Sequence, residues 1–298
     1  MISRHSAILG EFKFLGVASS TMPAITRLAR LSFAIAILAF GIQHLIYGDF
    51  VTRVAPKLPA WIPWHPLWAY MAGIGLIAAA AAMLVGKGAR QAALLLGAAI
   101  LLSFVVLYLP LVAAGPPLSG VWTNAGKALA LSGGAFLVAG SLPRDGYNST
   151  GIFRWFDQLI PASPFFLSVF LILAGIQHFL FAAFVATLVP VWIPGHLFWT
   201  YFAGIALIAG GVGIIVPITA RLAALLSGIM IFLWVLVLHI PRAATAPHDS
   251  NETTAVFEAL AMSAAAFLIA RDANQPRHEP ADVSSPESPL GRVMESRG

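Results

Sequence analysis

The chain has 298 residues, of which 59% are hydrophobic and 10% are charged, and its formal net charge is +5. Soluble domains are about 45–50% apolar and about 25% charged, so this composition excludes a soluble globular enzyme, a disordered chain and a nucleic-acid-binding domain. Cysteine is absent, which excludes disulfides, thiol redox chemistry and cysteine-ligated metal or iron–sulfur centres. We therefore expect an integral membrane protein whose first partner is the lipid bilayer, with no nucleic-acid partner.

The chain begins with a mixed polar segment, residues 1–27, which we predict to be a cytoplasmic tail, with Met22 as an alternative start. Eight apolar segments of about 20 residues follow, each long enough to cross a hydrocarbon core of about 30 Å. They are residues 28–49, 67–85, 91–112, 122–141, 164–184, 197–217, 221–240 and 253–270. We predict that residues 142–163 form a cytoplasmic linker and that the polar residues 272–298 form a disordered cytoplasmic tail.

The basic residues predict the orientation in the membrane. Thirteen of the 17 Lys and Arg residues fall on the side that holds both termini, and three fall on the other side. Because cytoplasmic loops carry an excess of Lys and Arg, both termini are expected in the cytoplasm. Lys127 lies inside the fourth segment and is the one basic residue that topology does not explain.

The two halves of the chain repeat one another. The tetrapeptide at residues 41–44 recurs at residues 175–178, and residues 59–78 match residues 190–209 at 13 of 20 positions, including Trp, His, Pro and Tyr. Each copy contains four predicted helices, an even number, so both copies enter the membrane in the same direction. We therefore predict an all-α integral membrane protein of eight transmembrane helices, built as two parallel four-helix repeats at residues 28–141 and 164–271 and related by an axis along the membrane normal.

The repeat unit resembles the DoxX-like family of small bacterial membrane proteins. The resemblance rests on a Gly-x-x-His sequence at the end of the first helix, a loop rich in Pro and Trp, a glycine inside the second helix, and a proline near the end of the third. The first copy carries these features at Gly41, His44, Pro59 to Pro63, Gly73 and Pro110, and the second at Gly175, His178, Pro190 to Pro194, Gly204 and Pro241. The resemblance implies a four-helix bundle in the bacterial cytoplasmic (inner) membrane. Members of the family include a quinone-linked thiosulfate oxidoreductase subunit, so quinone is the cofactor that it brings into consideration, with a membrane or peripheral redox protein as partner.

Polar residues at membrane depth are the candidate ligand-binding site, because such residues are costly in a bilayer. The helix rise places His44 and Lys127 about 9 Å inside the outer boundary. The expected first layer is Gln43, His44, Tyr108 and Lys127, and the expected second layer is Gln177, His178, His239 and Glu258. Their donors could hold the carbonyl head group of a quinone or a lipid-like ligand, with apolar helix faces around its tail. No His-x-x-x-His or Glu-x-x-His pair is present, so neither a metal site nor a catalytic residue is assigned.

Each of these residues also has a structural interpretation. His44 and His178 could tie the bundle by donating to a carbonyl of a neighbouring helix. Lys127 and Glu258 occupy equivalent positions with opposite charge, so they could form an ion pair between the repeats, act separately on a ligand, or extend to the outer surface.

The loops before the second helix of each repeat have two interpretations. They fit an interfacial aromatic belt with a fixed turn, or alternatively a lid over the polar layer. The residues concerned are Trp61, Pro63, His65, Trp192, Pro194 and His196.

Three hypotheses follow for the function. The first is a protein that binds a hydrophobic ligand in the outer half of the bilayer, as the membrane subunit of a redox assembly rather than a stand-alone enzyme. The second is a non-catalytic assembly or scaffold subunit. The third is a small-molecule transporter, ranked last because the inner half of the predicted bundle carries few polar residues.

Overall fold

The computed structural model describes residues 3–51, 53, 55–56, 58–144 and 151–272, and these residues form helices and loops with no strand among them. Seven helical stretches in this part of the chain are long and apolar enough to cross a membrane. They are Pro23–Tyr47, His65–Val85, Ala89–Ala114, Ile152–Leu180, His196–Ile215, Ala220–Thr245 and Ser250–Arg271. The expected all-helical, multi-pass membrane architecture is confirmed at this level.

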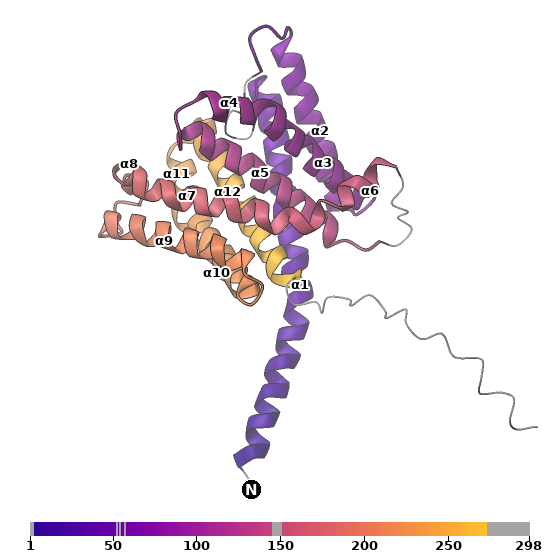
Figure 1. Ribbon diagram of the computed structural model, residues 1–298, viewed down its shortest axis with the longest axis vertical. Helices are drawn as coiled ribbons and strands as arrows, with labels where there is room; N and C mark the ends of the chain where they lie inside the picture. Colours follow the sequence, from indigo (N-terminus) through magenta and orange to yellow (C-terminus); the bar gives the residue numbers. More distant parts are fainter. Residues whose placement is uncertain (1–2, 52, 54, 57, 145–150, 273–298) are drawn as a thin grey trace, which may run out of the picture.

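The first half contains five α-helices and one π-helical turn (Figure 1). They are α1 (Ser3–Tyr47), α2 (His65–Val85), α3 (Ala89–Ser103), η1 (Phe104–Tyr108), α4 (Leu109–Ala114) and α5 (Gly120–Gly140). Residues 3–27, predicted to be a tail, lie within α1, which projects beyond the other helices towards the N-terminus (Figure 1). The apolar stretch of α1 begins at Pro23, close to the predicted start of the first segment.

The second half begins with two short elements that lie in the predicted linker, α6 (Ile152–Asp157) and η2 (Ile160–Ala162), and then repeats this order with one additional short helix, α8 (Ala182–Ala186). It continues with α7 (Ser163–Leu180), α8, α9 (His196–Ile215), α10 (Ala220–Trp234), η3 (Val235–His239), α11 (Ile240–Thr245) and α12 (Ser250–Asp272). The predicted linker is therefore partly helical. Residues 145–150 of the linker and residues 273–298 of the predicted tail lie outside the described residues.

Helix α5 corresponds to the fourth predicted segment but is not among the seven apolar stretches. Its 21 residues are enough to cross a bilayer, but Thr123, Asn124 and Lys127 lower its hydropathy. Almost all of its residues from Ala125 to Ala139 are buried against other helices. A helix enclosed by protein needs less apolar surface than one facing lipid, because neighbouring side chains satisfy its polar groups.

The helix contacts of the first half recur in the second. Helix α1 packs on α2 as α7 packs on α9, and α3 packs on α5 as α10 packs on α12. The halves meet where α1 packs on α12, where α5 packs on α7, and where α5 contacts α12. The first helix of each half therefore lies beside the last helix of the other. One apolar core, which includes Phe33, Leu131, Leu171 and Leu268, runs through both halves.

Glycines permit the closest helix contact in each half. A Cβ atom built on Gly41 would lie 2.8 Å from the backbone oxygen of Gly73, and one built on Gly175 would lie 2.7 Å from that of Gly204. Both distances are too short for a side chain, so the backbones can approach this closely only where these positions are glycine. Within each half, the first two membrane helices therefore meet through the same small-residue contact.

The third helix of each half contains a π-helical turn, at η1 and at η3, two residues before Pro110 and Pro241 respectively. Proline lacks a backbone N–H, and its ring clashes with the carbonyl four residues earlier, which disturbs the hydrogen bonds of the preceding turn. The last residues of the two π turns are Tyr108 and His239. Because π turns often occur at functional sites, both residues remain candidates for a site.

Candidate functional site

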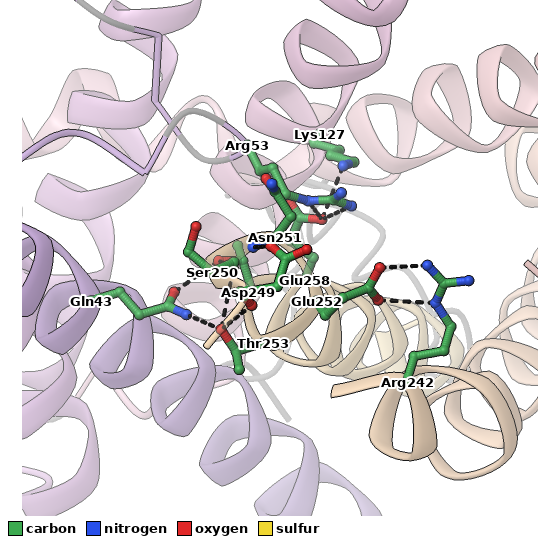
Figure 2. Close-up of polar contacts among 11 residues, drawn as sticks. Gln43, Arg53, Lys127, Arg242, Asp249, Ser250, Asn251, Glu252, Thr253 and Glu258 are labelled. Carbon is green, nitrogen blue, oxygen red and sulfur yellow. Dashed lines mark hydrogen bonds and ion pairs between the residues drawn. The ribbon is translucent and has the colours of Figure 1, made fainter. Parts of the chain in front are cut away.

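Lys127 on α5 and Glu258 on α12 form a buried ion pair where these two helices meet (Figure 2). The Lys127 Nζ atom lies 2.9 Å from the Glu258 Oε2 atom. Of the three interpretations of these residues, the ion pair between the halves is confirmed. Charges buried in a bundle are costly unless they are paired, so Lys127 requires the carboxylate of Glu258.

Arg53 supplies a second cation to the same carboxylate oxygen. Its Nη2 and Nε atoms lie 2.9 and 3.2 Å from Glu258 Oε2. The residue belongs to the connection between α1 and α2, and its side chain is 31% exposed, against 6% for that of Glu258. In the sequence, Arg53 is one of the three basic residues on the side opposite the termini, and it was not assigned to the site. The sequence could have pointed to Arg53, because its outer loop lies on the side of the membrane where Glu258 was expected.

Three buried polar atoms around this pair have no hydrogen-bond partner among the described residues: Glu258 Oε1, Tyr108 Oη and His239 Nδ1. Tyr108 is 2% exposed and Glu258 is 4% exposed. Buried polar atoms are nearly always satisfied in folded proteins, so these three atoms are the candidates for contact with a polar ligand or water.

Tyr108 and His239 reach this region from the two π turns. The turn η1 contacts α5, and η3 contacts α12. Tyr108 packs with Ala125 and Ala128, which flank Lys127 along α5. The charge of the Glu258 carboxylate acts on both Tyr108 and His239. The structure thus brings the four residues Tyr108, Lys127, His239 and Glu258 into one group, which we call the central cluster.

The structure brings Lys127 of the first expected layer into contact with Glu258 of the second. The physical reason is the packing of the halves, because α5 and α12 contact one another directly. Side chains at equivalent positions on these helices therefore face a common region.

Gln43 and Gln177 lie outside the central cluster and join the halves at two equivalent places. The Thr123 hydroxyl on α5 donates to Gln177 Oε1 on α7 over 2.8 Å, and the Thr254 hydroxyl on α12 donates to Gln43 Oε1 on α1 over 3.1 Å. Gln43 Nε2 also donates to Thr253 Oγ1 at 3.0 Å (Figure 2). Neither threonine was singled out from the sequence, although Thr123 and Thr254 are equivalent in the repeat.

His44 and His178 bond within their own helices. The Nδ1 atom of His44 donates to the carbonyl of Phe40, and that of His178 to the carbonyl of Ala174, both at 2.7 Å. The structural interpretation placed the acceptor on a neighbouring helix, and that detail is wrong. Because Nδ1 carries the proton, Nε2 of each neutral ring is left as an acceptor. The His178 ring stacks on Trp234, with ring centroids 6.4 Å apart.

The loop residues lie at the surface. Trp61 is 81% exposed and Trp192 is 69% exposed, and Pro63 and Pro194 are exposed as well. His65 bonds within its loop, with Nε2 3.2 Å from the Pro59 carbonyl, and the carbonyl of His196 accepts from Thr200 in the next helical turn. This exposure fits an interfacial aromatic belt better than a closed lid.

A second ion pair lies beside the central cluster. Arg242 on α11 binds Glu252 on α12 through both of its carboxylate oxygens (Figure 2). Fork-shaped pairing of this kind fixes the geometry as well as the charge. His239, three residues before Arg242, interacts electrostatically with both members.

Two further orphaned atoms, Ser119 Oγ and Trp122 Nε1, lie at the start of α5, and neither residue was singled out from the sequence.

The chemistry of the whole region is hydrogen bonding and charge. Among the described residues, no group of three or more His, Asp or Glu side chains could hold a metal ion. The arrangement is therefore suited to binding a polar group.

Comparisons with known proteins are limited to the second half. Residues 167–273 match a family model described as a domain of unknown function (DUF8561). That match includes His178, His239 and Glu258 but not Tyr108 and Lys127. The comparisons with curated proteins and with solved structures gave no match.

Proposed function

We propose that the protein is a DoxX-like bacterial inner-membrane protein with eight transmembrane helices in two parallel repeats and with both termini in the cytoplasm. Helix α5 is the eighth span, because it is long enough and is enclosed by other helices. The recurrent helix contacts and the two equivalent Gln–Thr bonds support the repeat. The distribution of Lys and Arg supports the orientation.

We further propose that the central cluster binds the polar head group of a hydrophobic ligand, a quinone or a lipid-like molecule. The observation that carries this proposal is the set of orphaned atoms, Glu258 Oε1, Tyr108 Oη and His239 Nδ1, around a buried ion pair. An unsatisfied buried polar atom costs about 1–3 kcal/mol, so a head group that satisfies several of them gains binding energy there. Apolar helix faces supply the surroundings for the tail.

The partners proposed for this function are the bilayer and a membrane or peripheral redox protein. The site offers donors and acceptors for a carrier molecule, and the absence of cysteine leaves the chain without thiol redox chemistry of its own. A ligand that carries electrons would therefore exchange them with another subunit. In this role the chain is a binding subunit rather than a stand-alone enzyme.

The test is purification from native membranes in a mild detergent, followed by mass spectrometry of bound small molecules and proteins. Wild type and Tyr201→Phe should retain the same hydrophobic ligand, while Tyr108→Phe and His239→Ala should retain less of it. Tyr201 is a matched control because it is an exposed tyrosine on α9 that stacks on Phe179 through its ring. Equal ligand content in all four proteins, or none in wild type, would contradict ligand binding at the central cluster.

The second candidate function is an assembly or scaffold subunit. The observation in its favour is that Gln43, Gln177, Lys127 and Glu258 all bond across the boundary between the halves. On this alternative the polar residues hold the bundle together and present its surface to another protein. The same purification separates the two functions, because a scaffold retains a protein partner but no small molecule.

A further inference from the structure

The central cluster presents an acceptor that a carbonyl head group cannot use. Glu258 Oε2 receives Lys127 Nζ at 2.9 Å and both Nη2 and Nε of Arg53 at 2.9 and 3.2 Å. Glu258 Oε1 is buried and has no partner among the described residues. A carboxylate oxygen accepts hydrogen bonds and donates none. A group that binds to Oε1 must therefore bring a donor.

Tyr108 offers the complementary group. Its hydroxyl is buried and unpartnered, and a phenolic hydroxyl both donates and accepts. The side chain packs with Ala125 and Ala128 on either side of Lys127, within the field of the Glu258 carboxylate. A ligand oxygen that contacts both Tyr108 and Glu258 would accept from the one and donate to the other.

We infer that the central cluster recognises a ligand through a hydroxyl group, as in a hydroquinone, another phenol or a long-chain alcohol. This inference rests on the ligand-binding function proposed above. A hydroxyl donates to Glu258 Oε1 and accepts from Tyr108, so it satisfies both atoms. A quinone carbonyl satisfies Tyr108 alone and faces the carboxylate oxygen with its own lone pairs. An anionic head group meets the same repulsion.

Three probes with the same tail test the inference: 2-decyl-1,4-hydroquinone, 2-decyl-1,4-benzoquinone and 2-decyl-1,4-dimethoxybenzene. Their dissociation constants are measured by native mass spectrometry on the full-length protein in lipid nanodiscs. Wild type should bind the hydroquinone about tenfold more tightly than either of the others, because only the hydroquinone supplies a donor to Oε1. Tyr201→Phe should leave all three constants unchanged.

Glu258→Gln gives the sharpest result. Lys127 and Arg53 hold the oxygen of the new amide, so its NH2 group takes the place of Oε1 and becomes a donor. The preference should then reverse in favour of the quinone. Tyr108→Phe keeps the carboxylate, so it should weaken binding of the hydroquinone and the quinone while the hydroquinone remains the preferred probe. Tyr108→Phe therefore tests the hydroxyl inference if Glu258→Gln does not fold.

Equal binding of the three probes by wild type would overturn the hydroxyl inference while leaving the proposed function in place. An unchanged preference in folded Glu258→Gln would also overturn it. If none of the probes binds and no small molecule copurifies with wild type, both the inference and the proposed function fail.

Discussion

Lys127 and Glu258 stand at equivalent positions in the two halves of the chain, 131 residues apart, and bind each other at 2.9 Å. Two identical chains paired about a two-fold axis would bring two lysines or two glutamates together at this contact. Opposite charges at equivalent positions therefore require two halves of different sequence. Tyr108 in the first half and His239 in the second are likewise equivalent and different.

The ion pair predicts an order of stabilities. Glu258→Gln leaves both Lys127 and Arg53 without their carboxylate, so it should lower the free energy of unfolding by about 3 kcal/mol, as removal of one member of a buried pair does. Lys127→Met should cost less, because Arg53 still binds Glu258. Arg53→Gln should cost about 1 kcal/mol or less, since the arginine is partly exposed. Thermal unfolding in detergent, followed by tryptophan fluorescence, measures the order.

The control is the double variant Lys127→Met with Glu258→Gln, which leaves Arg53 alone without a partner. It should be no less stable than Glu258→Gln, because the buried lysine charge is gone. If Lys127→Met proved more damaging than Glu258→Gln, Arg53 would not support the carboxylate as the contacts indicate.

Exchange of the two charges should not restore stability. In Lys127→Glu with Glu258→Lys the pair across the halves is formed again, but Arg53 then faces a lysine at position 258. Like charges in contact are destabilising in a medium of low dielectric constant, so the exchanged protein should unfold below the wild-type temperature. Addition of Arg53→Gln to the exchanged protein should raise that temperature, whereas in wild type the same change should lower it. Full recovery by exchange alone would contradict this.

The two Gln–Thr bonds predict pairwise coupling. Thr123→Val and Gln177→Leu break the same contact, so their effects on stability should be less than additive, by about 0.6 kcal/mol, the average for interhelical bonds in membranes. Thr123→Val and Gln43→Leu lie in different contacts, and their effects should add. Double-mutant cycles on reversible unfolding in detergent micelles measure both. Additivity within the first pair would show that Thr123 and Gln177 do not stabilise one another.

Much of the fold could be predicted from sequence because hydropathy and turn residues act locally. The apolar segments, the repeat and the break at Pro110 are all visible in short stretches of chain. Partner choice is not local. Gln43 and His44 are neighbours on α1, yet Gln43 bonds to α12 while His44 bonds within its own helix. Which helices meet depends on how the halves pack, and a repeat does not reveal that.

The tight glycines give the last prediction. Gly41→Ala and Gly175→Ala each place a Cβ atom within 2.8 Å of a backbone oxygen on the facing helix, at Gly73 and Gly204. A backbone cannot rotate away as a side chain can, so each change should cost about 1–3 kcal/mol.

Gly75→Ala is the matched control for these variants. A Cβ atom at Gly75, on α2, has no atom within 4 Å. The change should be neutral or stabilising by up to about 1 kcal/mol, because alanine favours helix. Unfolding temperatures of the three single variants measured in one detergent decide the point. If the two halves are assembled alike, the changes at Gly41 and Gly175 should cost similar amounts of stability. An equal loss of stability at Gly75 would show that the loss of glycine itself is responsible, rather than the close approach of the helices.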